Sequence, residues 1–142
     1  DEIIEHFTVD NSPLQSNTVN AAYADAKSNL VYFGTNQGLL SYASNSAPAA
    51  EDYSEVYAYP NPVRPDYTGW ITVKGLMNNS LVKITDSAGN VVFSGVSNGG
   101  MFTWDGCNTN GRRVKSGVYY VFASQNSGSG PSGAVSKILI LN

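Results

Sequence analysis

The chain has 142 residues and a net charge of −3, and only 13% of its residues are charged. This length fits one domain, or a small domain with a fragment of another, and suffices to bury about 68–70% of the unfolded surface. The charge excludes the strongly basic footprint of a nucleic-acid-binding protein. Asn, Ser, Thr and Gly must cover the surface instead, a composition typical of proteins outside the cytoplasm.

Reactive side chains are scarce. Cys107 is the single cysteine and His6 the single histidine, so neither an internal disulfide nor a Cys/His metal cluster is available. No general acid and base, and no nucleophile with its base, stand out. No run reaches the ~20 apolar residues of a membrane-spanning helix, and no signal peptide is recognisable at Asp1. The sequence therefore predicts a protein that is not an enzyme and that holds no cofactor or metal ion.

Short strands separated by turns are predicted for the first third of the chain. Their ranges are 3–8, 19–24, 30–34 and 39–42. Aromatic and β-branched residues favour the third of these strands, and Thr35 to Gly38 has the composition of a hairpin turn. The small, polar stretch with one proline that follows indicates a linker, which we place at residues 46–55.

Seven short strands are predicted for the rest of the chain, with turn signals between them and no helical periodicity. Their ranges are 56–59, 70–74, 81–85, 91–93, 101–104, 118–124 and 134–141. Pro60 and Pro62 cannot donate to a strand ladder, so they belong at an edge or a crossing. This number and spacing of strands favours an immunoglobulin-like β-sandwich.

The stretch from Trp104 to Val121 organises this second part. Its central residues Asp105 and Gly106 suit a tight turn between two strands. Burial of a side chain as large as Trp104 stabilises a fold by roughly 2–3 kcal/mol. The residues that we expect to form this structural motif are Trp104, Asp105, Gly106, Gly111, Gly117 and Tyr119.

A first resemblance covers residues 10–42. N-S-P-L-Q-S-N-T-V (11–19) followed by V-Y-F-G-T-N-Q-G-L-L-S-Y (31–42) is similar to one repeat of the two-component-regulator β-propeller family. The resemblance implies that residues 1–45 are part of the last blade of a larger propeller, with 3–8 as the outer strand of the preceding blade. The alternative is that these strands simply extend the main domain.

A second resemblance covers residues 56–142. Its motifs are Y-P-N-P-V (59–63), I-T-V-K-G-L (71–76), V-K-I-T-D-S-A-G-N-V-V (82–92), W-D-G-C-N-T-N-G-R-R-V-K-S-G-V-Y (104–119) and K-I-L-I (137–140). As a set they resemble the C-terminal domains associated with type IX secretion, and the Ig-like domain of flagellar hook-capping proteins. The expected fold is therefore all-β: a propeller-blade remnant (1–45), a linker (46–55) and a seven-stranded immunoglobulin-like sandwich (56–142).

A propeller followed by such a sandwich resembles the propeller-bearing component of the type IX sortase attachment complex. The resemblance implies a non-enzymatic binding or assembly module in the periplasm or on the outer-membrane surface. Its partners would be proteins of a secretion or sortase complex, or a lipopolysaccharide-type glycan, and not nucleic acid. Two alternatives are a cleavable sorting domain of secreted cargo and a glycan-binding module of a polysaccharide-responsive sensor.

Two candidate binding surfaces follow from residue type. Arg112, Arg113 and Lys115 form a basic cluster that can meet an anionic lipid–saccharide head group, because arginine binds phosphate bidentately. The alternative is a solvated loop. A second surface of aromatic residues with an acid could bind a glycan, although strands often expose aromatic residues without such a role. Its members are Tyr59, Asp66, Tyr67 and Trp70.

Two short patterns suggest other sites. Asp105, Asn108 and Asn110 supply oxygens at close spacing, which suits calcium, but they lack the length and the glutamate of an EF-hand loop and suit a turn equally. The tripeptide Asp86-Ser87-Ala88 resembles an acceptor for O-glycosylation and falls in an expected exposed turn.

Overall fold

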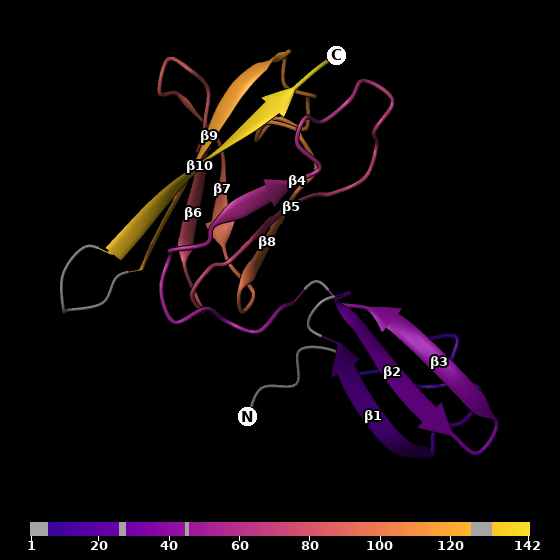
Figure 1. Cartoon of the computed structure of the whole chain (residues 1–142). Helices are drawn as coiled ribbons and strands as arrows, with labels where there is room; N and C mark the ends of the chain where they lie inside the picture. Colours follow the sequence, from indigo (N-terminus) through magenta and orange to yellow (C-terminus); the bar gives the residue numbers. More distant parts are fainter. Residues whose placement is uncertain (1–5, 26–27, 45, 126–131) are drawn as a thin grey trace. The chain divides into compact units, whose positions relative to one another are not determined.

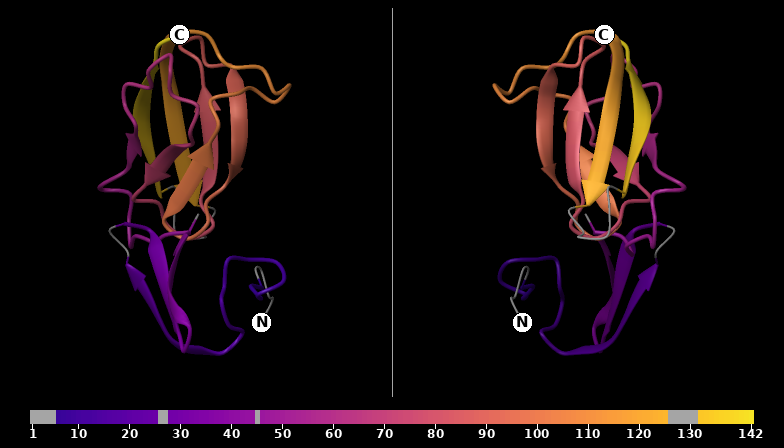
Figure 2. Two further views of the ribbon diagram at one scale, coloured as in Figure 1. Left: turned by 90° about the vertical axis from the view of Figure 1, so that its right-hand side faces the viewer. Right: turned by 90° about the vertical axis from the view of Figure 1, so that its left-hand side faces the viewer.

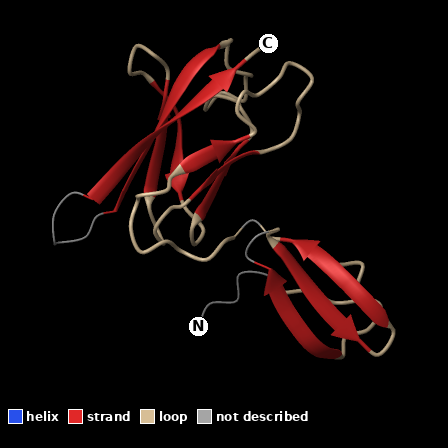
Figure 3. Ribbon diagram, in the orientation of Figure 1, coloured by secondary structure: helices blue, strands red, loops and turns tan. Residues whose placement is uncertain are grey.

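The computed structural model describes residues 6–25, 28–44, 46–125 and 132–142. The chain forms two compact units, unit 1 (Asp1–Ser44) and unit 2 (Asn45–Asn142). The regular structure of the described residues consists of β-strands alone (Figures 1 and 3). The all-β class expected from the sequence is therefore confirmed.

Unit 1 contains a three-stranded antiparallel sheet in the order β1-β2-β3 (Figure 1). The strands are β1 (Val19–Asp25), β2 (Leu30–Thr35) and β3 (Gly38–Ala43). Phe33 of β2 pairs with Leu40 of β3, and Thr35 pairs with Gly38 at the hairpin end. The Thr35 hydroxyl donates to the Gly38 carbonyl at 2.9 Å and so stabilises the expected hairpin turn.

The strand expected at residues 3–8 is not seen in the part of this range that the structure describes. Residues 3–5 lie outside the described residues, and residues 6–8 are not in a strand. The backbone of Thr8 instead belongs to a turn, since its amide donates to Asn11 Oδ1 at 2.7 Å and its carbonyl accepts from Ser12 Oγ at 2.6 Å. Local hydrogen bonds between side chains and backbone, such as these two, compete with the hydrogen bonds of a sheet.

Unit 2 is a sandwich of a three-stranded and a four-stranded antiparallel sheet (Figure 2). The first sheet, in the order β4-β5-β8, contains β4 (Tyr57–Tyr59), β5 (Ile71–Lys74) and β8 (Met101–Trp104). The second, in the order β10-β9-β6-β7, contains β6 (Leu81–Thr85), β7 (Val91–Val96), β9 (Gly117–Gln125) and β10 (Ser132–Ile140). Three plus four strands is the arrangement of a seven-stranded immunoglobulin-like fold.

The core of unit 2 consists of alternate residues of both sheets. Apolar residues two apart in β5, β6 and β10 are fully buried, as their alternation predicts: Ile71, Val73, Val82, Ile84, Ile138 and Ile140. Trp104 is also fully buried and packs against Tyr119. Each of these aliphatic side chains contributes about 1.5–3 kcal/mol by its removal from water.

The two prolines mark the point where the chain changes sheets. Tyr57 in β4 pairs with Lys74 of β5 in the first sheet. Beyond the prolines, the Val63 amide donates to the Leu139 carbonyl at 2.8 Å, beside β10 of the second sheet. Prolines at this crossing lose no ladder hydrogen bond, in agreement with the sequence-based expectation.

Residues 46–55, expected to be a linker, pack on unit 2. The Gly100 amide donates to the Ala47 carbonyl, and the Ala50 amide to the Leu76 carbonyl, each at 2.8 Å. Tyr53 is buried, and its hydroxyl lies 2.7 Å from Ser80 Oγ. The composition of this segment is that of a linker, but long-range backbone partners and one aromatic side chain make it part of the sandwich.

Candidate functional site

The loop between β8 and β9 uses its polar side chains to bind its own backbone. Asp105 Oδ1 accepts a hydrogen bond from the Cys107 amide at 2.8 Å. Asn108 Oδ1 accepts from the amides of Asn110 and Arg112 at 3.0 and 3.1 Å. Two of the three side chains considered for calcium, Asp105 and Asn108, therefore serve as turn acceptors. Within the described ranges, no three or more His, Cys, Asp or Glu side chains are grouped to hold a metal ion.

Trp104 and Tyr119 attach both ends of this loop to the core. Trp104 Nε1 donates to the Cys107 carbonyl at 2.7 Å, and the Tyr119 hydroxyl donates to the Lys115 carbonyl at 2.8 Å. Tyr119 is the third residue of β9 and bonds to a carbonyl four residues upstream. This geometry is that of the tyrosine corner of immunoglobulin-like domains.

The glycines of the expected motif differ in their roles. Gly106 and Gly111 have φ angles of +75° and +73°, which glycine adopts at far lower cost than other residues. Gly117 begins β9, and a Cβ built on it would lie 3.9 Å from the Tyr119 ring, an ordinary contact. Turn geometry therefore explains the first two glycines, and nothing in the structure explains the third.

Burial governs the ionisation of two side chains near the loop. Burial raises the pKa of the Cys107 thiol, and the nearby Asp105 charge raises it further. A thiol in this environment stays protonated near neutral pH and is a weak nucleophile. Burial also raises the pKa of the Tyr119 phenol, with a smaller contribution from the charge of Asp86.

The basic residues of the loop do not act as one surface. Arg113 donates through Nη1 to the Asp105 carbonyl at 3.2 Å and through Nη2 to the Tyr67 carbonyl at 3.3 Å. Its guanidinium therefore joins the β8–β9 loop to the segment that precedes β5. Arg112 and Lys115 are exposed, so these two cations remain accessible to an anionic partner.

The aromatic surface is also divided. Tyr67 is half-buried, and its hydroxyl donates to the Trp70 carbonyl at 2.8 Å, while the Trp70 side chain is 60% exposed. Asp66 and Tyr67 line a shallow surface pocket of about 230 Å³ together with Pro60, Pro62 and Arg64. Tyr59 stacks on Tyr57, with ring centroids 6.0 Å apart.

The turn between β6 and β7 presents the tripeptide that resembles an O-glycosylation acceptor. Ser87 is exposed there, as expected. Asp86 Oδ1 accepts hydrogen bonds from the amides of Ala88 and Asn90, each at 2.9 Å, and so fixes the turn.

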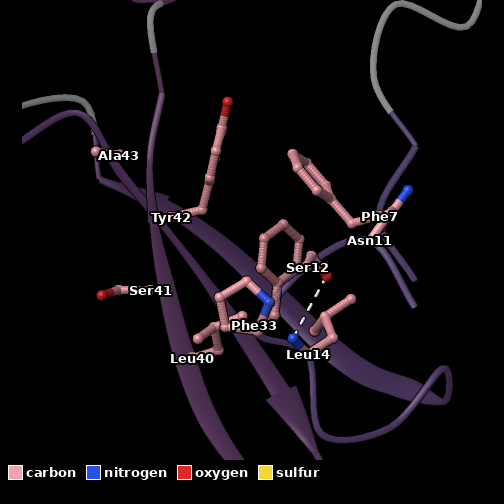
Figure 4. A pocket seen from close by; sticks show the side chains of 10 residues that line it. Phe7, Asn11, Ser12, Leu14, Phe33, Leu40, Ser41, Tyr42 and Ala43 are labelled. Carbon is pink, nitrogen blue, oxygen red and sulfur yellow. Dashed lines mark hydrogen bonds between the residues drawn. The ribbon is translucent and has the colours of Figure 1, made fainter. Parts of the chain in front are cut away.

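Unit 1 contains a pocket that the sequence did not indicate. It has a volume of about 240 Å³ and lies between the segment before β1 and the residues of β2 and β3 (Figure 4). Phe7 lines it, with its ring centroid 4.7 Å from that of Tyr42 and 6.3 Å from that of Phe33. Leu14 is buried on the same side. Leu14 falls outside every expected strand and Phe7 falls in the strand expected at 3–8, so the predicted strands did not assign either residue to a cavity wall.

Two of three comparisons relate the chain to known proteins. The family model of the FlgD Ig-like domain matches residues 68–129. The chain is similar to PorZ of Porphyromonas gingivalis, described as an essential bacterial surface component of its type IX secretion system. The two are 31% identical over 99% of this chain, which covers 19% of PorZ, with a TM-score of 0.63. No curated protein matches the chain.

Two further solved structures match the chain at lower similarity. Dimeric latent PorU from P. gingivalis is 21% identical, with 79% of this chain and 12% of that chain covered and a TM-score of 0.49. The BSP domain of a biofilm-associated protein is 20% identical, with 80% and 18% covered and a TM-score of 0.42.

The fold and the comparisons agree on unit 2. The FlgD match and the three-plus-four-stranded sandwich together confirm the expected Ig-like domain. The similarity to PorZ links the chain to a component of type IX secretion, although the chain spans only about a fifth of the length of PorZ. No helix in the described parts of the chain has the length and apolar character needed to cross a membrane.

Proposed function

We propose that the chain is a non-enzymatic binding and assembly module of a bacterial surface protein that works with the type IX secretion system. The observation that carries the proposal is the similarity to PorZ, at 31% identity over 99% of this chain. That similarity includes both units, so it links their combination, and not the sandwich alone, to a secretion component. The site of action is then the periplasm or the outer-membrane surface.

Unit 1 contributes part of a β-propeller blade to this proposal. Three antiparallel strands in sequential order, joined by short turns, support this role, because a propeller blade is a four-stranded sheet of this kind. The outer strand β1 exposes most of its residues, including Tyr23. An exposed strand edge of this kind is suited to a fourth strand from the rest of a propeller.

Unit 2 supplies the surface for partner proteins. The β8–β9 loop supports a binding role over a catalytic one, because Asp105 and Asn108 accept hydrogen bonds from backbone amides and the pKa of Cys107 is raised. Immunoglobulin-like sandwiches commonly bind through their loops, edges or sheet faces, so the specificity of this module depends on which of them is exposed.

The test compares the full-length protein with a variant that lacks residues 56–142. Both are expressed in the native cell, and the sortase-complex proteins that copurify from outer-membrane extract are quantified. We expect the deletion to abolish their recovery while the remaining protein still reaches the surface. Unchanged recovery would refute the assembly role.

Mass spectrometry of the mature surface protein separates this proposal from a cleavable sorting domain. An assembly module keeps residues 56–142 in the mature protein, whereas a sorting signal is removed on export. Peptides that cover β9 and β10 at the same abundance as peptides of unit 1 are expected. Their absence from the mature surface protein would assign the sandwich to cargo sorting.

A further inference from the structure

The outer face of the four-stranded sheet is unusually apolar for a surface. Antiparallel sheets with one solvated face normally alternate apolar residues inward with polar residues outward. Here six of the outward positions carry large apolar side chains that are exposed, beside serines such as Ser94 and Ser124. These six residues define the outer sheet face: Leu81, Val96, Val118, Phe122, Val135 and Leu139.

Strand register makes these side chains neighbours. Phe122 of β9 lies opposite Val135 of β10, and Val118 lies opposite Leu139. In the neighbouring strand pair of the same sheet, Leu81 of β6 lies opposite Val96 of β7. Side chains that face each other across neighbouring strands are in contact distance. The exposed fractions of Phe122 and Val135 are 43% and 58%, so a partner could bury a large part of both.

Both edges of this sheet are partly covered, which leaves its face as the open surface. Beside β10, the Val63 amide donates to the Leu139 carbonyl at 2.8 Å and the Leu141 amide donates to the Val63 carbonyl at 2.9 Å. Beside β7, the Thr109 amide of the β8–β9 loop donates to the Val92 carbonyl at 3.1 Å. Strand addition is therefore hindered at these points, and Figure 2 (right) shows the four strands side by side.

The charges on this face have one sign. The chain as a whole has 11 acidic and 8 basic residues, yet the segments of β6, β7, β9 and β10 contain Lys83 and Lys137 and no acidic residue. Lys83 lies opposite Phe122, at the centre of the outer sheet face. The Lys137 ammonium lies 5.9 Å from the centroid of the Tyr120 ring. Neither lysine forms an ion pair with a carboxylate in the described part of the chain.

The charge and the exposed apolar area of the outer sheet face together favour one kind of binding partner. A second copy of the same face would bring lysines towards lysines, which is unfavourable between facing surfaces. An anionic membrane is usually recognised by clusters of about 4–8 basic residues, more than this face carries. A protein surface with apolar side chains and adjacent carboxylates matches both the exposed apolar area and the two cations.

We propose that the outer sheet face is the docking surface of unit 2 for a partner protein that presents apolar side chains flanked by Asp or Glu. The proposal deepens the assembly role described above and rests on it. Phe122 and Val135 supply the buried centre of the contact, and Lys83 and Lys137 supply its charged positions. The binding energy then comes mainly from the apolar centre, and the lysines select the partner.

A zero-length carbodiimide cross-linker tests this assignment, because it joins lysine amines to carboxylates that are in direct contact. It is applied to native cells that express the full-length protein, and the cross-linked peptides are identified by mass spectrometry. We expect Lys83 or Lys137 to be joined to Asp or Glu of another protein. Lys115, exposed on the β8–β9 loop, serves as the control lysine and should give no link to the same acidic residues.

Substitutions then separate the apolar from the charged contribution. Phe122→Thr with Val135→Thr keeps residues suited to strands and should reduce the cross-links by about fivefold or more. Tyr57→Thr, at an exposed aromatic position of β4, should leave them unchanged. Lys83→Glu with Lys137→Glu should reduce copurification of the same partner by a similar factor, which keeps the test valid if the threonine variant fails to fold.

Four outcomes would overturn the proposal. Two of them concern the cross-linked partner: the lysines are joined to a second copy of the protein, detected in a mixture of ¹⁴N- and ¹⁵N-labelled protein, or to carboxylates of the same molecule. In the third, cross-linking is unchanged in both double variants. In the fourth, the protein floats with phosphatidylglycerol-containing vesicles, and Phe122→Thr abolishes this flotation. If deletion of residues 56–142 stops recruitment while both double variants recruit normally, the assembly role stands and the outer sheet face is not its docking surface.

Discussion

The ring of Trp104 packs against the ring of Tyr119 with centroids 5.8 Å apart and planes inclined by 58°. The polar atom of each side chain binds a backbone carbonyl of the loop between them, at Cys107 for Trp104 and at Lys115 for Tyr119. The pair therefore links the two sheets of the sandwich, since Trp104 is in β8 and Tyr119 is in β9. The same contact fixes the loop that carries the exposed cations Arg112 and Lys115.

Trp104→Phe should destabilise unit 2 by about 2–3 kcal/mol, since it removes the hydrogen bond to Cys107 and leaves a cavity in the core. Urea denaturation followed by circular dichroism measures the change in the free energy of unfolding. Trp70→Phe is the matched control, because the Trp70 side chain is exposed, and it should change the free energy by less than about 0.5 kcal/mol. Equal effects of the two substitutions would contradict a role for Trp104 in the core.

Tyr119→Phe should cost about 1 kcal/mol at neutral pH, the typical value of one hydrogen bond. Because burial raises the pKa of Tyr119, the stability that its neutral phenol contributes is fully present below about pH 10 and is lost as the pH rises through the raised pKa. The difference in unfolding free energy between wild type and variant should therefore shrink at alkaline pH. A difference that stays constant to pH 12 would argue against this ionisation.

Tyr57→Phe is the control for that experiment. Tyr57 is exposed on β4, and its ring stacks on Tyr59, a contact that phenylalanine retains. Its substitution should change the unfolding free energy by less than about 0.5 kcal/mol.

Gly75→Ala should release residues 46–55 from the sandwich. Gly75 has a φ of +79°, and a Cβ at this position would collide with the carbonyl oxygen of Glu55. We expect a loss of about 3 kcal/mol or more, because backbone on both sides of the contact must move. Hydrogen exchange at the Ala50 amide, which bonds to the Leu76 carbonyl, should become faster at the same time.

Gly89→Ala separates the steric effect from the conformational one. Gly89 has a φ of +87°, but nothing lies within 4 Å of a Cβ built on it. The expected cost is about 1–2 kcal/mol, from the left-handed backbone conformation alone. An equal cost for the two glycine substitutions would mean that residues 46–55 are not packed as the structure shows.

Short-range patterns were sufficient to predict most of the strands of the sandwich. Period-two alternation of apolar residues located β5 and β6, whose apolar members Ile71, Val73, Val82 and Ile84 are fully buried, and prolines located the crossing at Pro60 and Pro62. The ends of the longest hairpin were less predictable. Gln125 pairs with Ser132, so a serine that suggests a loop by its type is in β10 because its partner strand extends that far.

Long-range contacts explain what the sequence did not predict. Arg113 bonds to the carbonyl of Tyr67, 46 residues away, so its grouping with Arg112 and Lys115 could not reveal a structural role. The Tyr53 hydroxyl forms a hydrogen bond with Ser80, which lies 27 residues later in the sequence, and no local pattern indicates that contact. The outer sheet face likewise depends on the register of four strands, which the separate strand predictions do not define.

Substitution of Asp86 should make the stability of unit 2 less dependent on acid pH. Hydrogen bonds from the Asn90 side chain and backbone hold the pKa of this carboxyl below its ordinary value. A lowered pKa in the folded state means that the stabilisation is present above about pH 4 and is lost as the pH falls through the lowered value. The melting temperature of Asp86→Asn should therefore be lower than that of the wild type at pH 7, and the difference should shrink as the pH falls below about 4. Asp66→Asn, at an exposed position, is the matched control. If the difference for Asp86→Asn stays constant as the pH falls below about 4, the turn depends on the shape of this side chain and not on its charge.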